Sequence, residues 1–196
     1  MLTLFHAPRS RSTRFLWLLE ELGAPYQVEY VDIRRGDGSG ASDPRNLHPD
    51  KKVPALVDDG ALVSESAAIA LYLTDAFPQA KIGPVVGAPL RGSYLTWLAY
   101  YAGVLEPVIL AQFEGRTATD EALKREYEAL DARLLKTLEA NPYLLGEAFS
   151  AADILFASLL TFARQALPPH AAYDEWLGRL TTRPAYGRAL AKDLPA

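Results

Sequence analysis

Apolar and polar positions follow two different periods at the start of the chain. A short run of β-prone residues at 2–6 predicts a β-strand, and apolar side chains then repeat at helical spacing over residues 13–22. Gly23 follows at the position where a left-handed residue ends a helix. Tyrosine and valine alternate with mostly polar side chains over residues 26–30, so a second strand is expected.

The next fifty residues add a loop, a hairpin and a helix. Residues 34–43 carry three glycines without any periodicity, which is typical of a loop. Apolar residues at 55–57 and 62–63 flank an Asp-Asp-Gly turn, and a helical face follows over residues 65–76. This order predicts a small mixed sheet, with one parallel pair joined by a crossover helix and with helices against the sheet.

The composition changes after the second helix. Three prolines and two glycines fall within residues 78–89, as in a linker, and the rest of the chain has helical spacing. Residues 151–166 are apolar on nearly all sides, which predicts the buried helix of a bundle. We therefore expect an α/β domain followed by an all-α domain, with the boundaries 1–77, a linker at 78–88, and 89–196.

Charge and composition narrow the function classes. The 196 residues carry a net charge of -4, with 49% hydrophobic and 22% charged residues, which favours a globular protein over a nucleic-acid or membrane-surface binder. No apolar run approaches the roughly 20 residues of a membrane-spanning helix. The first residues lack the pattern of a secretion signal, so we expect a cytoplasmic protein.

The chain has no cysteine and three scattered histidines, His6, His48 and His170. The absence of cysteine excludes disulfides, cysteine zinc sites and any thiol nucleophile of the protein's own. The histidine spacing does not suggest a metal site, so we expect no metal. Chemistry must then rely on hydroxyls, carboxylates, backbone groups or a bound cofactor.

Four local motifs occur in a characteristic order. They are the Pro-Arg-Ser-Arg-Ser-Thr-Arg loop at residues 8–14, followed by an apolar helix, and the segments 48–56, 65–69 and 150–154. In this order and spacing the chain resembles the cytosolic glutathione S-transferase family, as a bacterial serine-type member, over essentially its whole length. The resemblance implies a thioredoxin-like domain followed by an all-helical domain that supplies the second-substrate pocket. It also implies reduced glutathione as co-substrate and a homodimer.

The resemblance places the γ-glutamyl end of glutathione at Glu65 and Ser66. A serine in the first turn of a helix offers a hydroxyl and free amides to a carboxylate, and the glutamate offers charge to the ammonium group. The alternative is that both residues only cap the helix.

Three further positions are implied for the rest of the tripeptide. Val53-Pro54 matches the family's cis-proline turn, where the backbone of the first residue pairs with the cysteinyl part of glutathione. Lys52 matches a position that meets the glycine carboxylate. Lys51 replaces a common glycine and is equally well explained as a surface lysine, and His48 stands where asparagine is common and is expected to be structural.

The catalytic group is expected in the first loop. A thiol has a pKa near 8.5, and a hydroxyl donor with nearby positive charge favours the reactive thiolate. Ser10 lies four residues before Arg14, the offset that serine-type members use for their catalytic serine. Ser12 is the second candidate, although it is better placed as the helix N-cap. Arg9 and Arg11 either add positive potential or are exposed loop charges.

Other classes of the family fit this loop less well. Cysteine-type members are excluded, and the Ser-Ser-Cys-Ser pattern of the maleylacetoacetate-isomerase branch is replaced by Arg-Ser-Arg-Ser at residues 9–12. Where tyrosine-type members have their tyrosine, this chain has Phe5 and His6, of which only His6 can donate a hydrogen bond. His6 is therefore a distant third candidate.

Two features of the helical domain have structural and functional interpretations. Ser150 and Asp153 form a capping-box variant, so Asp153 is expected to be structural rather than catalytic. Aromatic and apolar side chains after the linker are expected mostly in the core, and one or two of them can line a second-substrate pocket: Tyr100, Tyr101, Leu105 and Phe113.

The leading functional hypothesis is conjugation of reduced glutathione to a small apolar electrophile, with Ser10 stabilising the thiolate. The first alternative is a non-enzymatic interaction or regulatory protein of the same fold. The second is a glutathione-dependent isomerase or dehalogenase.

Overall fold

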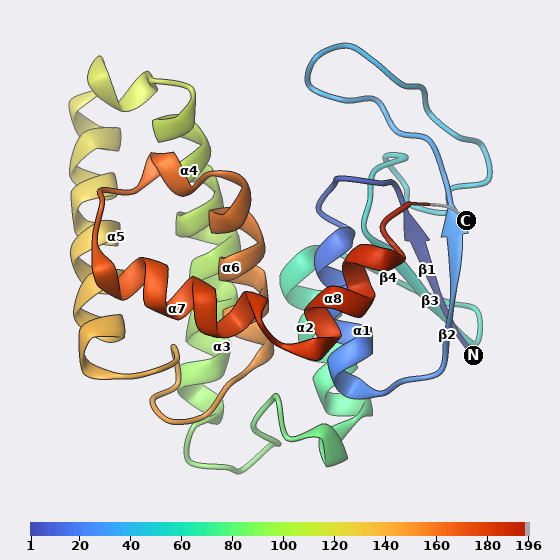
Figure 1. Cartoon of the computed structure of the whole chain (residues 1–196). Coiled ribbons are helices and arrows are strands. Elements are labelled where there is room, and N and C mark those ends of the chain that lie inside the picture. The colour runs from blue at the N-terminus through green and yellow to red at the C-terminus, as the bar shows by residue number, and fades with distance from the viewer. Residues whose placement is uncertain (195–196) are drawn as a thin grey trace. The chain divides into compact units, whose positions relative to one another are not determined.

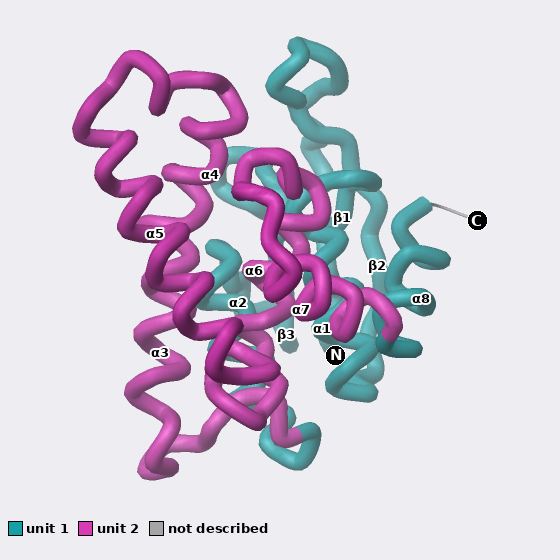
Figure 2. Tube along the Cα trace, turned by 60° about the vertical axis from the view of Figure 1, so that its left-hand side comes forward, with its two compact units in different colours: residues 1–80, 183–196 teal, residues 81–182 magenta. Residues whose placement is uncertain are grey.

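The computed structural model describes residues 1–194, so the last two residues of the predicted helical domain lie outside the described part. The chain forms two compact units (Figures 1 and 2). The first comprises Met1–Ala80 together with the chain from Arg183 onward, and the second comprises residues 81–182.

A four-stranded sheet forms the centre of the first unit. Its strands are β1 (Leu2–His6), β2 (Tyr26–Tyr30), β3 (Ala55–Asp58) and β4 (Ala61–Ser64), in the order β2-β1-β3-β4. The β1–β2 pair is parallel, whereas β3 runs antiparallel to both β1 and β4. The predicted parallel pair and hairpin are therefore confirmed.

Two helices of the first unit pack beside the sheet, and one of them connects two of its strands (Figure 1). Helix α1 (Thr13–Leu22) is the crossover between β1 and β2, and Gly23 ends it with a left-handed φ of 62°. This confirms the predicted end, because glycine adopts that conformation without a Cβ clash. Helix α2 (Ser66–Ala76) follows β4 and buries Ile69, Ala70 and Leu73.

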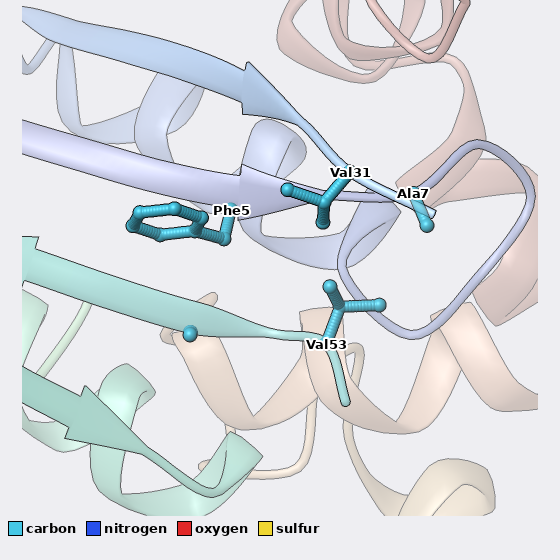
Figure 3. Packing of buried hydrophobic residues seen from close by; sticks show 5 residues of the cluster. Phe5, Ala7, Val31 and Val53 are labelled. Carbon is cyan, nitrogen blue, oxygen red and sulfur yellow. The ribbon is translucent and has the colours of Figure 1, made fainter. Parts of the chain in front are cut away.

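The strand register brings three connecting segments to one edge of the sheet. Phe5 near the end of β1 pairs with Ala55 at the start of β3, and Ala55 pairs with Ser64 at the end of β4. The loop after β1, the turn before β3 and the start of α2 therefore lie at the same edge. Figure 3 shows the apolar cluster beneath it, whose buried members are Phe5, Ala7, Val31, Val53 and Ala55.

The final helix departs from the predicted domain boundary. Helix α8 (Pro184–Ala191) was assigned with residues 89–196 to the helical domain, but it packs on α1 and belongs to the first unit (Figure 2). The ring of Tyr186 meets the edge of Trp17 at 4.8 Å between centroids. The periodicity of α8 predicts an amphipathic helix without indicating which partner its apolar face contacts.

Ion pairs add to this contact between the two ends of the chain. Arg183 donates two hydrogen bonds to the Glu21 carboxylate, at 2.6 and 2.8 Å. The Glu20 carboxylate accepts from Arg188 at 2.7 Å and from Lys192 at 2.5 Å. These hydrogen bonds outweigh the opposing effect of burial and lower the pKa of Glu20 to about 2.

The second unit is helical, as expected. Its helices are α3 (Arg91–Tyr100), a π-helical turn (Tyr101–Leu105), α4 (Glu106–Phe113), α5 (Glu121–Ala140), α6 (Ala151–Phe162) and α7 (Ala171–Thr181). Helix α6 is the buried helix that was predicted, but it ends at Phe162 instead of residue 166, since the backbone of Ala163 leaves the helical conformation with a φ of -116°. A short 3-10 turn, Arg164–Ala166, completes the predicted segment.

Length and composition alone would allow one helical stretch of the described chain, Arg91–Phe113, to cross a membrane. The most apolar part of this stretch is 44% buried inside the protein, and core helices of globular proteins can be equally long and apolar.

Candidate functional site

The loop after β1 presents one hydroxyl and buries another. Ser10 is half-buried, and its hydroxyl lies 2.7 Å from the carbonyl of Ala7 and 2.8 Å from the Ser12 hydroxyl. Ser12 is completely buried. Of the two candidate serines, Ser10 is therefore the one with exposed surface.

Ser12 occupies the N-cap position of α1 but does not act as the predicted cap. Its carbonyl accepts from Phe15 N at 2.9 Å, whereas its hydroxyl makes no cap hydrogen bond to the helix amides. The hydroxyl instead lies 2.8 Å from Nδ1 of His6 and accepts from the amide of Ala7 at 3.2 Å. The cap prediction was wrong because the neighbouring strand supplies a buried imidazole as a competing partner.

Asp193, near the other end of the chain, holds the same loop. Its carboxylate accepts from the amide of Arg9 at 3.0 Å and from the Thr13 hydroxyl at 2.5 Å. Its backbone carbonyl lies 3.0 Å from Nε2 of His6. Sequence reasoning missed Asp193 because no local motif links it to a loop about 180 residues away.

The arginines of the loop are mostly exposed to solvent. Arg9 and Arg11 are both exposed, and Arg9 has a positive φ of 53°. A third arginine, Arg35, reaches back from the glycine-rich loop and donates to the carbonyl of Pro8 at 2.9 Å. Three arginines therefore lie in or beside the loop that carries Ser10, together with the carboxylate of Asp193.

The turn before β3 has the predicted geometry. The Val53–Pro54 peptide bond is cis, and Val53 packs in the apolar cluster of Figure 3. Lys52 is exposed, and its carbonyl accepts from the Asn46 side chain at 2.9 Å. Asn46 was not singled out from the sequence, although it holds this turn in place.

Lys51 and His48 support the same turn from the preceding loop. Lys51 has a left-handed φ of 55°, the conformation that a glycine accommodates, and its ammonium group donates to the Asn46 carbonyl at 2.7 Å. Lys51 therefore adopts a backbone conformation that favours glycine. Nδ1 of the buried His48 accepts from the amide of Asp50 at 3.0 Å, which agrees with a structural role.

The start of α2 combines an unusual backbone with a positive helix end. Glu65 is exposed and has a φ of 69°, a region that costs a non-glycine residue about 1–3 kcal/mol. Its side chain makes no cap hydrogen bond. Ser66 is the first helical residue and is 9% exposed. Because the first amides of a helix have no partners within it, this edge suits a carboxylate.

Asp153 is structural, as predicted. Ser150 and Asp153 form the capping box at the start of α6. The completely buried Asp153 carboxylate also accepts from Leu144 N at 2.9 Å and from the Trp176 ring nitrogen at 3.2 Å. Burial raises its pKa to about 6 despite these donors.

The four candidate pocket residues of the helical unit differ in accessibility. Tyr101 and Leu105 are completely buried, which places them in the core. Phe113 is 45% exposed, and Tyr100 is half-buried with Arg133 4.2 Å above its ring. Tyr100 and Phe113 therefore keep surface available to a ligand. Within residues 1–194, no three carboxylate or imidazole side chains are grouped so as to hold a metal ion.

Comparison with known proteins identifies the family. A model of the glutathione S-transferase N-terminal domain matches residues 9–76, and a model of the C-terminal domain matches residues 96–176. The chain belongs to the glutathione S-transferase family. This transferase is 31% identical to glutathione S-transferase 3 of Schizosaccharomyces pombe, over 94% of its own length and 85% of the relative's.

Two further relatives bear on the activity. The disulfide-bond oxidoreductase YfcG of Escherichia coli is 30% identical to the transferase, over 98% of its chain and 95% of the relative's. A sphingomonad glutathione S-transferase, solved in complex with glutathione, is 30% identical and superimposes with a TM-score of 0.77, covering 97% and 98% of the two chains. Family membership makes this protein a glutathione transferase with a thioredoxin-like first domain.

Proposed function

We propose that the transferase conjugates reduced glutathione to small apolar electrophiles and that Ser10 stabilises the attacking thiolate. The observation that carries this proposal is the contrast between the two loop serines: Ser12 is completely buried and Ser10 is half-buried at the loop surface. Ser10 also lies at the sheet edge where the cis turn and the start of α2 meet.

The tripeptide is expected to lie along this edge. Ser66 and the first amides of α2 bind the γ-glutamyl carboxylate, and the exposed Glu65 carboxylate pairs with the ammonium group. The Val53 backbone before the cis Pro54 pairs with the cysteinyl part. The exposed Lys52 meets the glycine carboxylate.

This placement directs the sulfur toward the loop after β1. A hydrogen bond from the Ser10 hydroxyl to sulfur, together with the positive charge of Arg9 and Arg11, lowers the pKa of the thiol. The thiolate then forms a sulfur–carbon bond with an electrophile held beside it, and most of the rate gain comes from thiolate stabilisation and positioning.

We also propose that the protein is a cytoplasmic homodimer. Both properties are expected from the family. Light scattering at micromolar concentration should give twice the chain mass of 21.5 kDa. A mass of one chain would contradict the dimer and would favour a non-enzymatic interaction role.

The likeness to YfcG supports a second candidate, glutathione-dependent disulfide reduction. The chain has no cysteine, so both electrons would come from two glutathione molecules. Their thiolates would convert one disulfide into two thiols and leave oxidised glutathione. Assays with a model disulfide and with a panel of halogenated aromatics, epoxides and conjugated carbonyls separate the two activities.

Calorimetric titration with reduced glutathione tests the binding site. Ser66→Ala should weaken binding about 10- to 100-fold, because a hydrogen bond to a charged group contributes about 1.5–3 kcal/mol. Ser158→Ala is the matched control, since it removes a half-buried serine hydroxyl from α6. Absence of binding by the wild-type protein at millimolar glutathione would refute the proposed function.

A further inference from the structure

We propose that His6 accepts the proton of the glutathione thiol through a relay formed by the hydroxyls of Ser10 and Ser12, with Asp193 holding the imidazole. The inference deepens the proposed function and rests on it. It gives a role to a completely buried histidine that the conjugation mechanism otherwise leaves unused.

The hydrogen bonds of His6 determine which of its nitrogens can receive a proton. Nε2 lies 3.0 Å from the backbone carbonyl of Asp193, and a carbonyl only accepts, so Nε2 carries the hydrogen. Burial lowers the pKa of His6 and keeps the ring neutral before glutathione binds. Nδ1 is then a free acceptor, 2.8 Å from the Ser12 hydroxyl.

The hydroxyl protons of Ser12 and Ser10 extend the series of hydrogen bonds from His6 to the surface of the loop. Each serine hydroxyl has one proton to donate. Ser12 gives its proton to Nδ1 of His6, so its oxygen can accept from Ser10 at 2.8 Å. Ser10 in turn can accept from a thiol at the half-buried end of the loop. The Ser10 hydroxyl also lies 2.7 Å from the Ala7 carbonyl, to which it can donate instead. The relay uses the arrangement in which its proton turns from that carbonyl to Ser12, so that all the donors point from the sulfur toward His6.

Proton transfer along this series of hydrogen bonds conserves both atoms and charge. The S–H bond breaks and its electron pair stays on sulfur, each hydroxyl receives one proton and passes one on, and a new N–H bond forms at Nδ1. The reversed hydrogen bonds then run from His6 through Ser12 and Ser10 to the thiolate. After sulfur has attacked, the proton returns by the same path to the product or to water.

Asp193 is suited to stabilise the protonated ring. Its carboxylate lies 3.5 Å from Nε2 of His6 and also holds the loop through the amide of Arg9 and the hydroxyl of Thr13. Tyr30 is a further titratable group against the imidazole, and its ring meets that of His6 edge-on at 5.5 Å between centroids. His6 and Asp193 act on the thiol only through Ser10 and Ser12, so both are positioning residues.

The protonation state of His6 can be followed directly by ¹⁵N NMR of the histidine side chains at pH 7. His6 should be neutral with hydrogen on Nε2 in the free protein and should become protonated when reduced glutathione binds. S-methylglutathione, which has no thiol proton, should leave the ring neutral. His48 and His170 serve as internal controls. A ring that stays neutral with reduced glutathione, or that carries its hydrogen on Nδ1 in the free protein, overturns the relay.

Two variants separate proton acceptance from simple support of Ser12. His6→Asn keeps an oxygen acceptor near the position of Nδ1 but cannot take up a proton, whereas His6→Leu removes the acceptor altogether. The relay predicts that both raise the pKa of the bound thiol and slow conjugation at pH 6.5 at least tenfold, while glutathione affinity changes less than threefold. Ser12→Ala, which interrupts the relay between Ser10 and His6, should behave in the same way.

The results distinguish the relay from the proposed function. A wild-type thiol pKa in His6→Asn would overturn the relay alone and leave Ser10 as a simple hydrogen-bond donor. If Ser10→Ala also leaves the thiol pKa unchanged, or if the wild-type protein does not bind glutathione, then the proposed function fails together with the relay.

Discussion

Two hydrogen-bond networks centred on buried aspartates occur in this protein, one in each unit. The Asp153 carboxylate in the helical unit accepts hydrogen bonds from backbone amides and side chains of residues that are themselves buried. Asp193 in the first unit holds a loop whose hydrogen bonds continue through His6 and Ser12 to the half-buried Ser10. A closed network stabilises the fold, whereas a network that ends at an accessible hydroxyl can exchange a proton with a ligand.

The largest effect is expected when the closed network is broken. Asp153→Ala leaves several buried donors without an acceptor, so the free energy of unfolding should fall by about 3–5 kcal/mol. Urea denaturation measures this loss. Asp174→Ala is the control, because this carboxylate is 63% exposed and pairs with Arg164, and its loss should cost less than about 1 kcal/mol.

Equal losses of stability in the two aspartate variants would contradict the structural role of Asp153. So would a change in glutathione affinity in the folded fraction of Asp153→Ala.

Removing the Ser10 hydroxyl, at which the other network ends, should affect conjugation strongly and stability little. Ser10→Ala should raise the pKa of the bound glutathione thiol by one to two units, because one hydrogen bond to a charged sulfur is lost. Conjugation at neutral pH should slow about 10- to 100-fold. The free energy of unfolding should change by less than about 1 kcal/mol, since Ser10 is half-buried. Thiolate absorbance between pH 5 and 9 follows the first effect and urea denaturation the second.

Ser39→Ala, which removes an exposed hydroxyl bonded to Asp37 in the glycine-rich loop, should change neither the thiol pKa nor stability. If Ser10→Ala destabilises the protein as strongly as Asp153→Ala, the distinction between open and closed networks fails.

The smallest effect concerns the attachment of α8, which carries the chain to Asp193. Hydrogen bonds from Lys192 and Arg188 lower the pKa of Glu20 from 4.5 to about 2. The ionised group therefore stabilises the folded state above pH 4.5, and this contribution is lost as the pH falls from 4.5 to 2. Glu20→Gln should cost about 1–2 kcal/mol at pH 7, measured by urea denaturation.

The difference between Glu20→Gln and the wild type should disappear by about pH 2. The stability contribution of Asp153 depends on pH in the opposite sense. Its raised pKa of about 6 favours the folded state at low pH, and this contribution is lost as the pH rises from 3.8 to 6. A Glu20→Gln difference that persists unchanged at pH 2 would show that its ion pairs do not hold α8.

Local patterns in the sequence were enough to predict the elements and several details of the site. Helical and strand periods located α1, α2 and the parallel pair, Gly23 marked the end of α1, and the spacing of Ser150 and Asp153 indicated the capping box. Such features depend on residues a few positions apart, where backbone geometry determines which side chains meet. The family motifs added the cis Val53–Pro54 bond, which the structure contains. The roles of Ser10 and Ser66, which the same motifs indicated, stay predictions.

Tertiary structure alone decided which partners those groups have. The Ser12 hydroxyl bonds His6 instead of capping α1, because the sheet places an imidazole beside it. Asp193 reaches the same loop because α8 packs on α1, although about 180 residues separate the two in the sequence. An amphipathic period shows that a helix has an apolar face but carries no information on the surface that will cover it. The loop's connection to the C-terminal segment therefore became visible only in the folded chain.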